Sequence, residues 1–86
     1  QVVPRERLME TCLELAERMC RFSPYALAMS KQVLWANLEV SSLQAAIDLE
    51  NRNQLLLGLT DNLPECIAAR KEGRAPVYRD LPRTFD

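Results

Sequence analysis

The side chains best suited to chemistry in this 86-residue sequence form a basic cluster near its C-terminal end. Arg70, Lys71 and Arg74 surround Gly73 within the stretch TDNLPECIAARKEGRAP. Arginine offers a planar fork of donors and lysine a point charge, so the three residues could contact a phosphate group. Cations near a helix C-terminus also complement its carbonyl end, each by about 0.3–1 kcal/mol when exposed. The spacing alone leaves both interpretations open.

Lys31 and Glu50 are further candidates, because each interrupts an otherwise apolar helical stripe. A buried charge without a partner is costly, so the two could pair with each other, or Lys31 could extend to water. Both could instead face a surface that this sequence does not contain. A catalytic Glu50 is a third alternative, weakly supported by a lone carboxylate without a second acid–base group.

The three cysteines, Cys12, Cys20 and Cys66, do not have the spacing of metal ligands, and the sequence has no histidine. A zinc site would need a carboxylate as its fourth ligand, and imidazole acid–base chemistry is excluded. We therefore predict no metal site and no bound cofactor. The cysteines are interpreted as reduced residues of a cytoplasmic protein.

Charge and length exclude several classes of protein. The formal net charge is −1, with acids and bases mixed, unlike the strongly basic face of a nucleic-acid-binding protein. No apolar run approaches the roughly 20 residues that cross a bilayer, so no membrane association is predicted. A chain of this size forms one domain at most. Because it begins at Gln1, within QVVP, we expect a segment of a longer polypeptide.

The elements that must position these side chains are predicted to be about four helices, because apolar residues recur at helical spacing and nowhere alternate as in a strand. The first helix begins at Pro4 or Arg5. The second follows with Ser23 as its N-cap and Pro24 at its first helical position. The predicted fold class is therefore all-α, without strands.

The third helix is predicted to begin after Ser41 or Ser42 and to end at Gly58 as its C-terminal cap. It is apolar over more than one face, as a helix between two partners would be. Such a surface would be exposed in an isolated chain and would drive self-association. The leucines outside its main stripe are Leu49, Leu55, Leu56 and Leu59.

The fourth helix is predicted to open near residues 60–62 and to close at Gly73. Leu63 and Ile67 are expected to form its buried side. The chain then becomes extended or irregular, which divides it into a helical segment, residues 1–78, and an irregular C-terminal tail, residues 79–86.

The order of these signals resembles the C-terminal portion of the enoyl-CoA hydratase/isomerase (crotonase) family. The matching stretches are VVP, LMETCLELAERMCRFSPYALAMSKQVL, SSLQAAIDLEN and TDNLPECIAARKEGRAPVY, nearly all of residues 2–78. The family's last segment has the form T-x-D-x-x-E-G-x-x-A-F-x-E-K-R-x-P-x-F. The positions that correspond over the whole match are Ser23, Pro24, Lys31, Glu50, Thr60, Glu65, Ala69, Glu72, Arg74, Pro76 and Tyr78.

This resemblance implies that the catalytic groups lie in a core that would precede Gln1, so no catalytic residue is expected in this chain. The segment would pack between subunits of a trimer or hexamer and cover the CoA of a 2-enoyl-CoA substrate in fatty-acid metabolism. Its implied partners are its own N-terminal core, further copies of itself and acyl-CoA.

In the family, an aromatic residue and a lysine of the last helix lie near the nucleotide part of CoA. Here Arg70 replaces the usual phenylalanine and Gly73 the usual lysine, whereas Arg74 keeps its place and Arg70 or Lys71 could substitute. The competing interpretation is a stand-alone helical protein-interaction module without a catalytic role, in which the basic residues only cap a helix.

Overall fold

The computed structural model describes residues 1–85 and is all-α, as predicted: within that range it has four α-helices and no strand. A short 3-10 helix, η1 (Arg5–Arg7), leads into α1 (Leu8–Met19). The other helices are α2 (Pro24–Asn37), α3 (Leu43–Gly58) and α4 (Asn62–Glu72). Asp86, the last residue of the predicted tail, lies outside the described residues.

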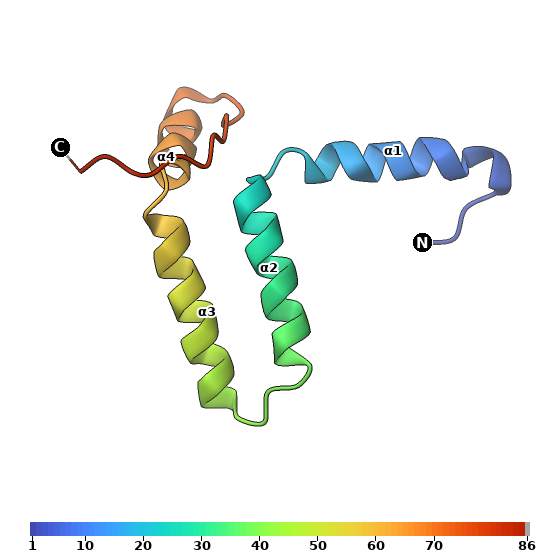
Figure 1. Ribbon diagram of the computed structural model, residues 1–86. Coiled ribbons are helices and arrows are strands. Elements are labelled where there is room, and N and C mark those ends of the chain that lie inside the picture. The colour runs from blue at the N-terminus through green and yellow to red at the C-terminus, as the bar shows by residue number, and fades with distance from the viewer. Residues whose placement is uncertain (86) are drawn as a thin grey trace.

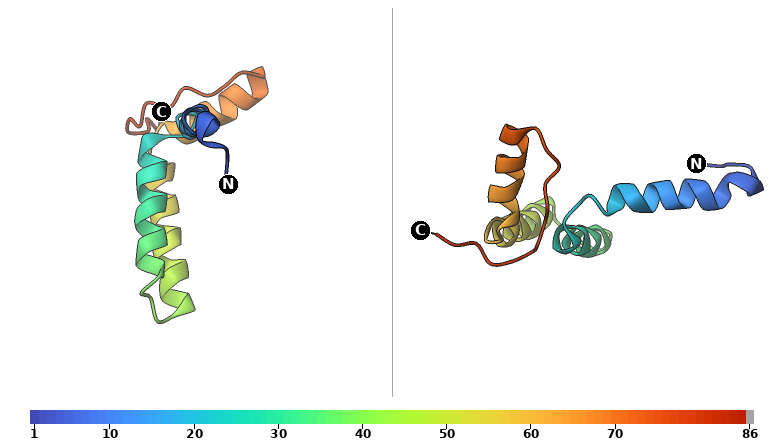
Figure 2. Two further views of the ribbon diagram at one scale, coloured as in Figure 1. Left: turned by 90° about the vertical axis from the view of Figure 1, so that its right-hand side faces the viewer. Right: turned by 90° about the horizontal axis from the view of Figure 1, so that it is seen from above.

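The helices form an open arrangement (Figure 1). α2 and α3 lie side by side as an antiparallel hairpin, and α4 runs crosswise at one end of it (Figure 2). α1 extends away from the hairpin and packs against η1 but against none of the other helices. The radius of gyration is 16.6 Å, whereas a compact domain of this length has about 12 Å.

Local signals fix most helix ends as predicted. The Ser23 hydroxyl accepts a hydrogen bond from the Ala26 amide at 3.0 Å and caps α2, with Pro24 at the first helical position. Of the two serines before α3, Ser42 is the cap, and it accepts from the Ala45 amide at 3.3 Å. These bonds satisfy amides that have no partner within the helix.

The two glycines behave differently. Gly73 ends α4 in the left-handed conformation, with φ 68°, and the Arg74 amide donates to the Ala69 carbonyl at 3.0 Å in a Schellman-type cap. The prediction that Gly58 caps α3 is wrong. Gly58 is the last helical residue, and Leu59 follows with φ −85° because its amide bonds the Leu56 carbonyl in a tight right-handed turn.

The predicted buried side of α4 is also wrong. Leu63 and Ile67 are 48% and 49% exposed, whereas Ala69 is 1% exposed. The reason is the crosswise placement of α4, which packs against α3 and not along the hairpin.

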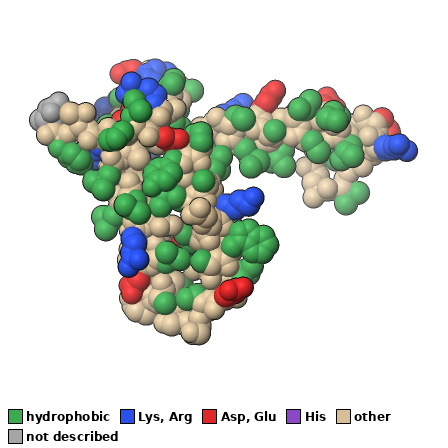
Figure 3. All heavy atoms as spheres, in the orientation of Figure 1, with side chains coloured by type: hydrophobic (Ala, Val, Ile, Leu, Met, Phe, Trp, Pro, Cys, Tyr) green, Lys and Arg blue, Asp and Glu red, His purple; other side chains and the backbone are tan. Residues whose placement is uncertain are grey.

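Very little apolar surface is buried anywhere in residues 1–85. Met29 and Ala69 are the buried apolar residues, and Figure 3 shows apolar side chains along α1 and over the hairpin. The accessible surface is 7525 Å², against about 5,200 Å² for a folded monomer of this mass. The difference, about 2,300 Å², is surface that a compact protein would cover. Among residues 1–85, none of the helices combines the length and the apolar character that a membrane span requires.

Candidate functional site

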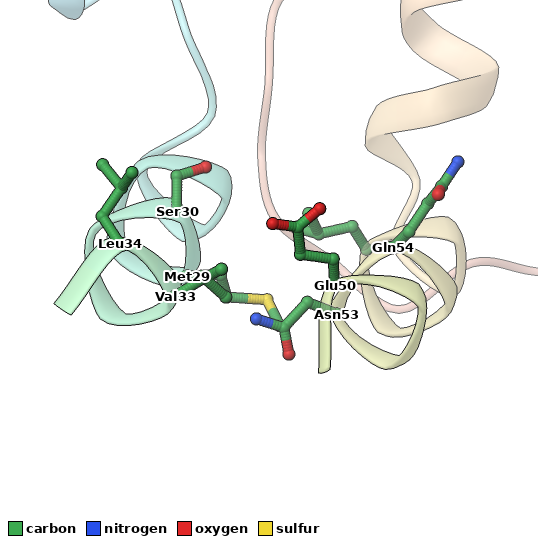
Figure 4. A pocket seen from close by; sticks show the side chains of 8 residues that line it. Met29, Ser30, Val33, Leu34, Glu50, Asn53 and Gln54 are labelled. Carbon is green, nitrogen blue, oxygen red and sulfur yellow. The ribbon is translucent and has the colours of Figure 1, made fainter. Parts of the chain in front are cut away.

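Glu50 lies at a groove between α2 and α3, with a volume of about 360 Å³ (Figure 4). Met29, Glu50 and Asn53 point toward the space between the two helices. The Glu50 carboxylate accepts a hydrogen bond from the Asn37 side-chain amide at 3.1 Å, and the described residues show no ion pair between Glu50 and Lys31. Glu50 is the only titratable side chain lining the groove, so the groove contains no acid–base pair.

The basic residues at the end of α4 have different surroundings. Arg70 and Lys71 lie in the last turn and are exposed, and neither makes an ion pair within residues 1–85. Arg74 follows the Gly73 cap, and its guanidinium is bound to carboxylates. Its Nη1 donates to one oxygen of Glu65 at 2.5 Å and its Nη2 to the other at 3.1 Å. Its Nε donates to Glu72 at 2.6 Å.

These bonds explain the electrostatics of the turn after α4. The Arg74 guanidinium, followed by the Val77 amide, lowers the pKa of Glu65 from 4.5 to about 2. In return, the hydrogen bonds to Glu65 and then Glu72 raise the pKa of Arg74. Nη1 also donates to the Ala75 carbonyl at 3.3 Å, so most Arg74 donors are already in use. Arg70 and Lys71 are therefore the more available cations for an added anion.

Residues 76–85, which we call the C-terminal strap, run back from this turn past the start of α4 (Figure 1). The Asp61 amide donates to the Leu81 carbonyl at 2.7 Å, and the Leu81 amide donates to the Asp61 carboxylate at 3.1 Å. The Arg83 amide donates to the Leu59 carbonyl at 2.7 Å. Arg79 donates to the Asp61 carboxylate at 2.7 Å. The strap is thus tied to the turn between α3 and α4.

A polar cluster of Ser23, Asn62 and Asp80 joins the strap to the starts of α2 and α4. Asp80 Oδ1 accepts from the Ser23 hydroxyl at 2.5 Å and from Asn62 Nδ2 at 2.6 Å. Asn62 Nδ2 also donates to Ser23 Oγ at 3.1 Å, and the Asp80 amide donates to Asn62 Oδ1 at 3.2 Å. Ser23 and Asn62 are 5% and 8% exposed. Hydrogen bonds from Ser23 and then Asn62 lower the pKa of Asp80.

The sequence indicated only the first member of this polar cluster, since Ser23 was recognisable as an N-cap. Asp80 lies 57 positions from Ser23 and 18 from Asn62, in a stretch without helical period. No local pattern could have found that pairing.

A second hollow, of about 310 Å³, lies beside the polar cluster. Phe22, Leu57 and Leu63 form part of its wall, and Cys66 and Tyr78 also line it. The neighbouring Cys66 thiol, followed by burial, raises the pKa of Tyr78. All three cysteines are free and exposed. Within the described part of the chain, no group of three or more histidine, cysteine or acidic residues could hold a metal ion.

Comparison with known proteins gives a consistent result, although no family model matches. The chain is 42% identical over 79 residues to the probable enoyl-CoA hydratase EchA12 of Mycobacterium tuberculosis, covering 91% of this chain and 28% of that protein. It is 37% identical over 78 residues to the 2,3-dehydroadipyl-CoA hydratase of Escherichia coli, covering 91% and 30%.

The structural comparison agrees. A crystal structure of a probable enoyl-CoA hydratase/isomerase from Mycobacterium abscessus matches with a TM-score of 0.82 and 38% sequence identity, over 91% of this chain and 30% of that one. The chain thus spans less than a third of the length of the relatives that it matches. In sequence and in fold, it fits a C-terminal segment of a protein of the enoyl-CoA hydratase/isomerase (crotonase) family.

Proposed function

We propose that this chain is the helical segment of a cytoplasmic acyl-CoA hydratase or isomerase of fatty-acid metabolism, and that it joins subunits and covers the CoA. The observation that carries the proposal is the 42% identity over 79 residues to a probable enoyl-CoA hydratase. In this proposal residues 1–78 form the family segment and residues 79–86 a tail.

The exposed apolar surface supports a role in assembly. The excess of about 2,300 Å² over a compact monomer lies within the roughly 1,000–2,500 Å² that each partner buries in an obligate interface. α1 contributes to it directly, because its apolar stripe is exposed and no helix other than η1 covers it. We propose that the catalytic core of the same protein and further copies of the chain, in a trimer or hexamer, cover this surface.

The available carboxylates argue that the segment does not catalyse the reaction by itself. Hydration of an enoyl thioester needs donors at the thioester oxygen and a positioned acid–base pair. Glu50 has no second acid–base group in its groove, and Glu65 is held by Arg74. We therefore assign no catalytic residue to this chain and place those groups in the remainder of the parent protein.

The end of α4 supports the proposed CoA contact. Arg70 and Lys71 are exposed and unpaired within residues 1–85, so they can reach a phosphate group without breaking an ion pair. Arg74 would have to break a bond to Glu65 or Glu72 before it could bind the phosphate, since its donors already bind these carboxylates. We propose Arg70 and Lys71 as direct contacts and Arg74 as the residue that shapes the turn beside them.

The proposal is tested with the full-length protein that carries these residues. We expect it to hydrate crotonyl-CoA, seen as loss of the enoyl-thioester absorbance, and we expect residues 1–86 alone to show no turnover. A full-length protein that neither turns over enoyl-CoA nor binds CoA would favour the stand-alone interaction module. Turnover by a clean sample of residues 1–86 would refute the proposed division of labour.

A further inference from the structure

The orientation of α4 is not explained by apolar packing. Only Asn62 and Ala69 of this helix are buried, and its larger apolar residues, Leu63 and Ile67, are about half exposed. Its helix contacts are with α3, beyond a short turn, and it does not pack along α2. A helix with so little apolar burial could adopt several orientations about that turn unless other bonds restrain it.

Hydrogen bonds to the C-terminal strap supply a restraint along the side of α4. Asp61, just before the helix, exchanges backbone and side-chain bonds with Leu81. One turn into the helix, the Glu65 carboxylate accepts from the Val77 amide at 2.9 Å. α4 and the strap are therefore bonded at two levels and can move as one unit.

Asp80 connects this unit to the hairpin. Its Oδ1 accepts hydrogen bonds from the side chains of Ser23 and Asn62. Its Oδ2 accepts a hydrogen bond from the Tyr25 amide at 3.2 Å. Tyr25 follows Pro24 in the first turn of α2, where backbone amides have no partner within the helix. Asp80 thus acts as a second cap of α2, supplied from the other end of the chain.

The backbone at Asp80 supports this assignment. Its φ is 55°, the only positive value at a non-glycine residue among those described. L-residues rarely adopt this left-handed conformation, and it persists where surrounding bonds determine it. Here the Asp80 amide is bonded to Asn62 and the carboxylate to the starts of α2 and α4.

We propose that Asp80 is a positioning residue, whose carboxylate fastens the C-terminal strap to α2 and thereby fixes the orientation of α4. Fastening holds the α4–strap unit at one angle to the hairpin. It also sets where Arg70 and Lys71 lie, a consequence for CoA that rests on the proposed function.

The first test is hydrogen–deuterium exchange of the intact protein with three variants. Asp80→Ala removes the carboxylate, and Asp80→Gly removes it while suiting the positive φ. Asp80→Asn keeps one oxygen acceptor and tolerates this conformation. We expect the Leu81 and Arg83 amides to exchange at least about tenfold faster in the alanine and glycine variants, a loss of about 1.4 kcal/mol of protection. The asparagine variant should restore part of it, because its single oxygen can replace only one of the two acceptors that Asp80 supplies.

Asp48→Ala is the matched control, because Asp48 accepts a side-chain bond from Gln44 at 2.8 Å within α3 and has no bond to the strap. It should leave exchange in the strap unchanged. Strap exchange that is unchanged in Asp80→Gly would overturn the proposal, since the backbone conformation alone would then hold the strap. Equal acceleration of all helices in both the alanine and the glycine variants would also overturn it, because Asp80 would then stabilise the whole fold.

The second test measures the distance between α2 and α4, which changes if α4 changes its orientation. Spin labels at Lys31→Cys in α2 and Lys71→Cys in α4, in the intact protein with its native cysteines replaced by serine, report the distance between the two helices. We expect one narrow distance distribution with Asp80, and a broadened or shifted one with Asp80→Ala. An unchanged distribution would refute the proposal. Neither test needs CoA or turnover, so both are independent of the proposed enzymatic function.

Discussion

Ser23→Ala is the substitution whose effect can be worked out most fully from the structure. The hydroxyl caps α2 through the Ala26 amide and also accepts from the side chain of Asn62, which is buried. Loss of an N-cap costs about 1 kcal/mol. The substitution also removes two bonds of the buried polar cluster, the one that Ser23 accepts from Asn62 and the one that it donates to Asp80, while Asn62 keeps its own bond to Asp80. Loss of these buried bonds costs about 1–3 kcal/mol more. We therefore expect Ser23→Ala to lower the free energy of unfolding by about 2–4 kcal/mol.

Ser42→Ala is the matched control, because Ser42 caps α3 through the Ala45 amide and has no tertiary side-chain partner among the described residues. Ser42→Ala should lower the free energy of unfolding by about 1 kcal/mol, the contribution of the helix cap alone. Urea unfolding followed by far-UV circular dichroism measures both variants against the native protein. A difference between the two serines of less than about 0.5 kcal/mol would refute the reasoning, because Ser23 would then be an ordinary helix cap.

The remaining predictions concern charge, binding and assembly. Because the pKa of Glu65 is lowered from 4.5 to about 2, its bond to the turn stabilises the fold above pH 4.5 and is lost as the pH falls toward 2. The native protein should therefore be more stable than Glu65→Gln at neutral pH, and this difference in the free energy of unfolding should shrink as the pH falls from 4.5 toward 2; a difference that does not change with pH would contradict this. Arg70→Ala with Lys71→Ala should weaken CoA binding by the full-length protein severalfold in calorimetry, more at low salt, whereas Lys31→Ala should not. If this double variant bound CoA as tightly as the native protein, Arg70 and Lys71 would only stabilise the end of the helix. Leu15→Glu, on the exposed stripe of α1, should shift the protein to smaller species in light scattering; an unchanged mass would exclude α1 from the interface.

Much of the fold was predictable because helix ends are encoded by neighbouring residues. Ser23 and Pro24 mark the start of α2, because the serine accepts a bond from a free amide of the first turn and proline needs no partner for its nitrogen there. Gly73 marks the end of α4, because it readily adopts the left-handed conformation that closes the helix. Gly58 shows the limit of such signals. The glycine was available as a cap, but the chain continued in a right-handed turn that needed no glycine.

The candidate site was predictable in residue type but not in pairing. The basic residues after Ala69 were evident from the sequence. The sequence could not show that Arg74 binds Glu65 while Arg70 and Lys71 stay exposed. The burial of α4 was mispredicted for a related reason. An apolar stripe indicates which face could be covered, and only the packing of other elements decides whether it is.

By itself, the sequence determined the positions of the cations and the excess of apolar residues. It also determined the helical class and most helix boundaries, because these depend on contacts between residues a few positions apart. The tertiary structure alone decided the exposure of the apolar stripes, the partner of Arg74 and the meeting of Ser23, Asn62 and Asp80. Hydrogen bonds between residues up to 57 positions apart depend on how whole helices are placed, and no local period records that placement.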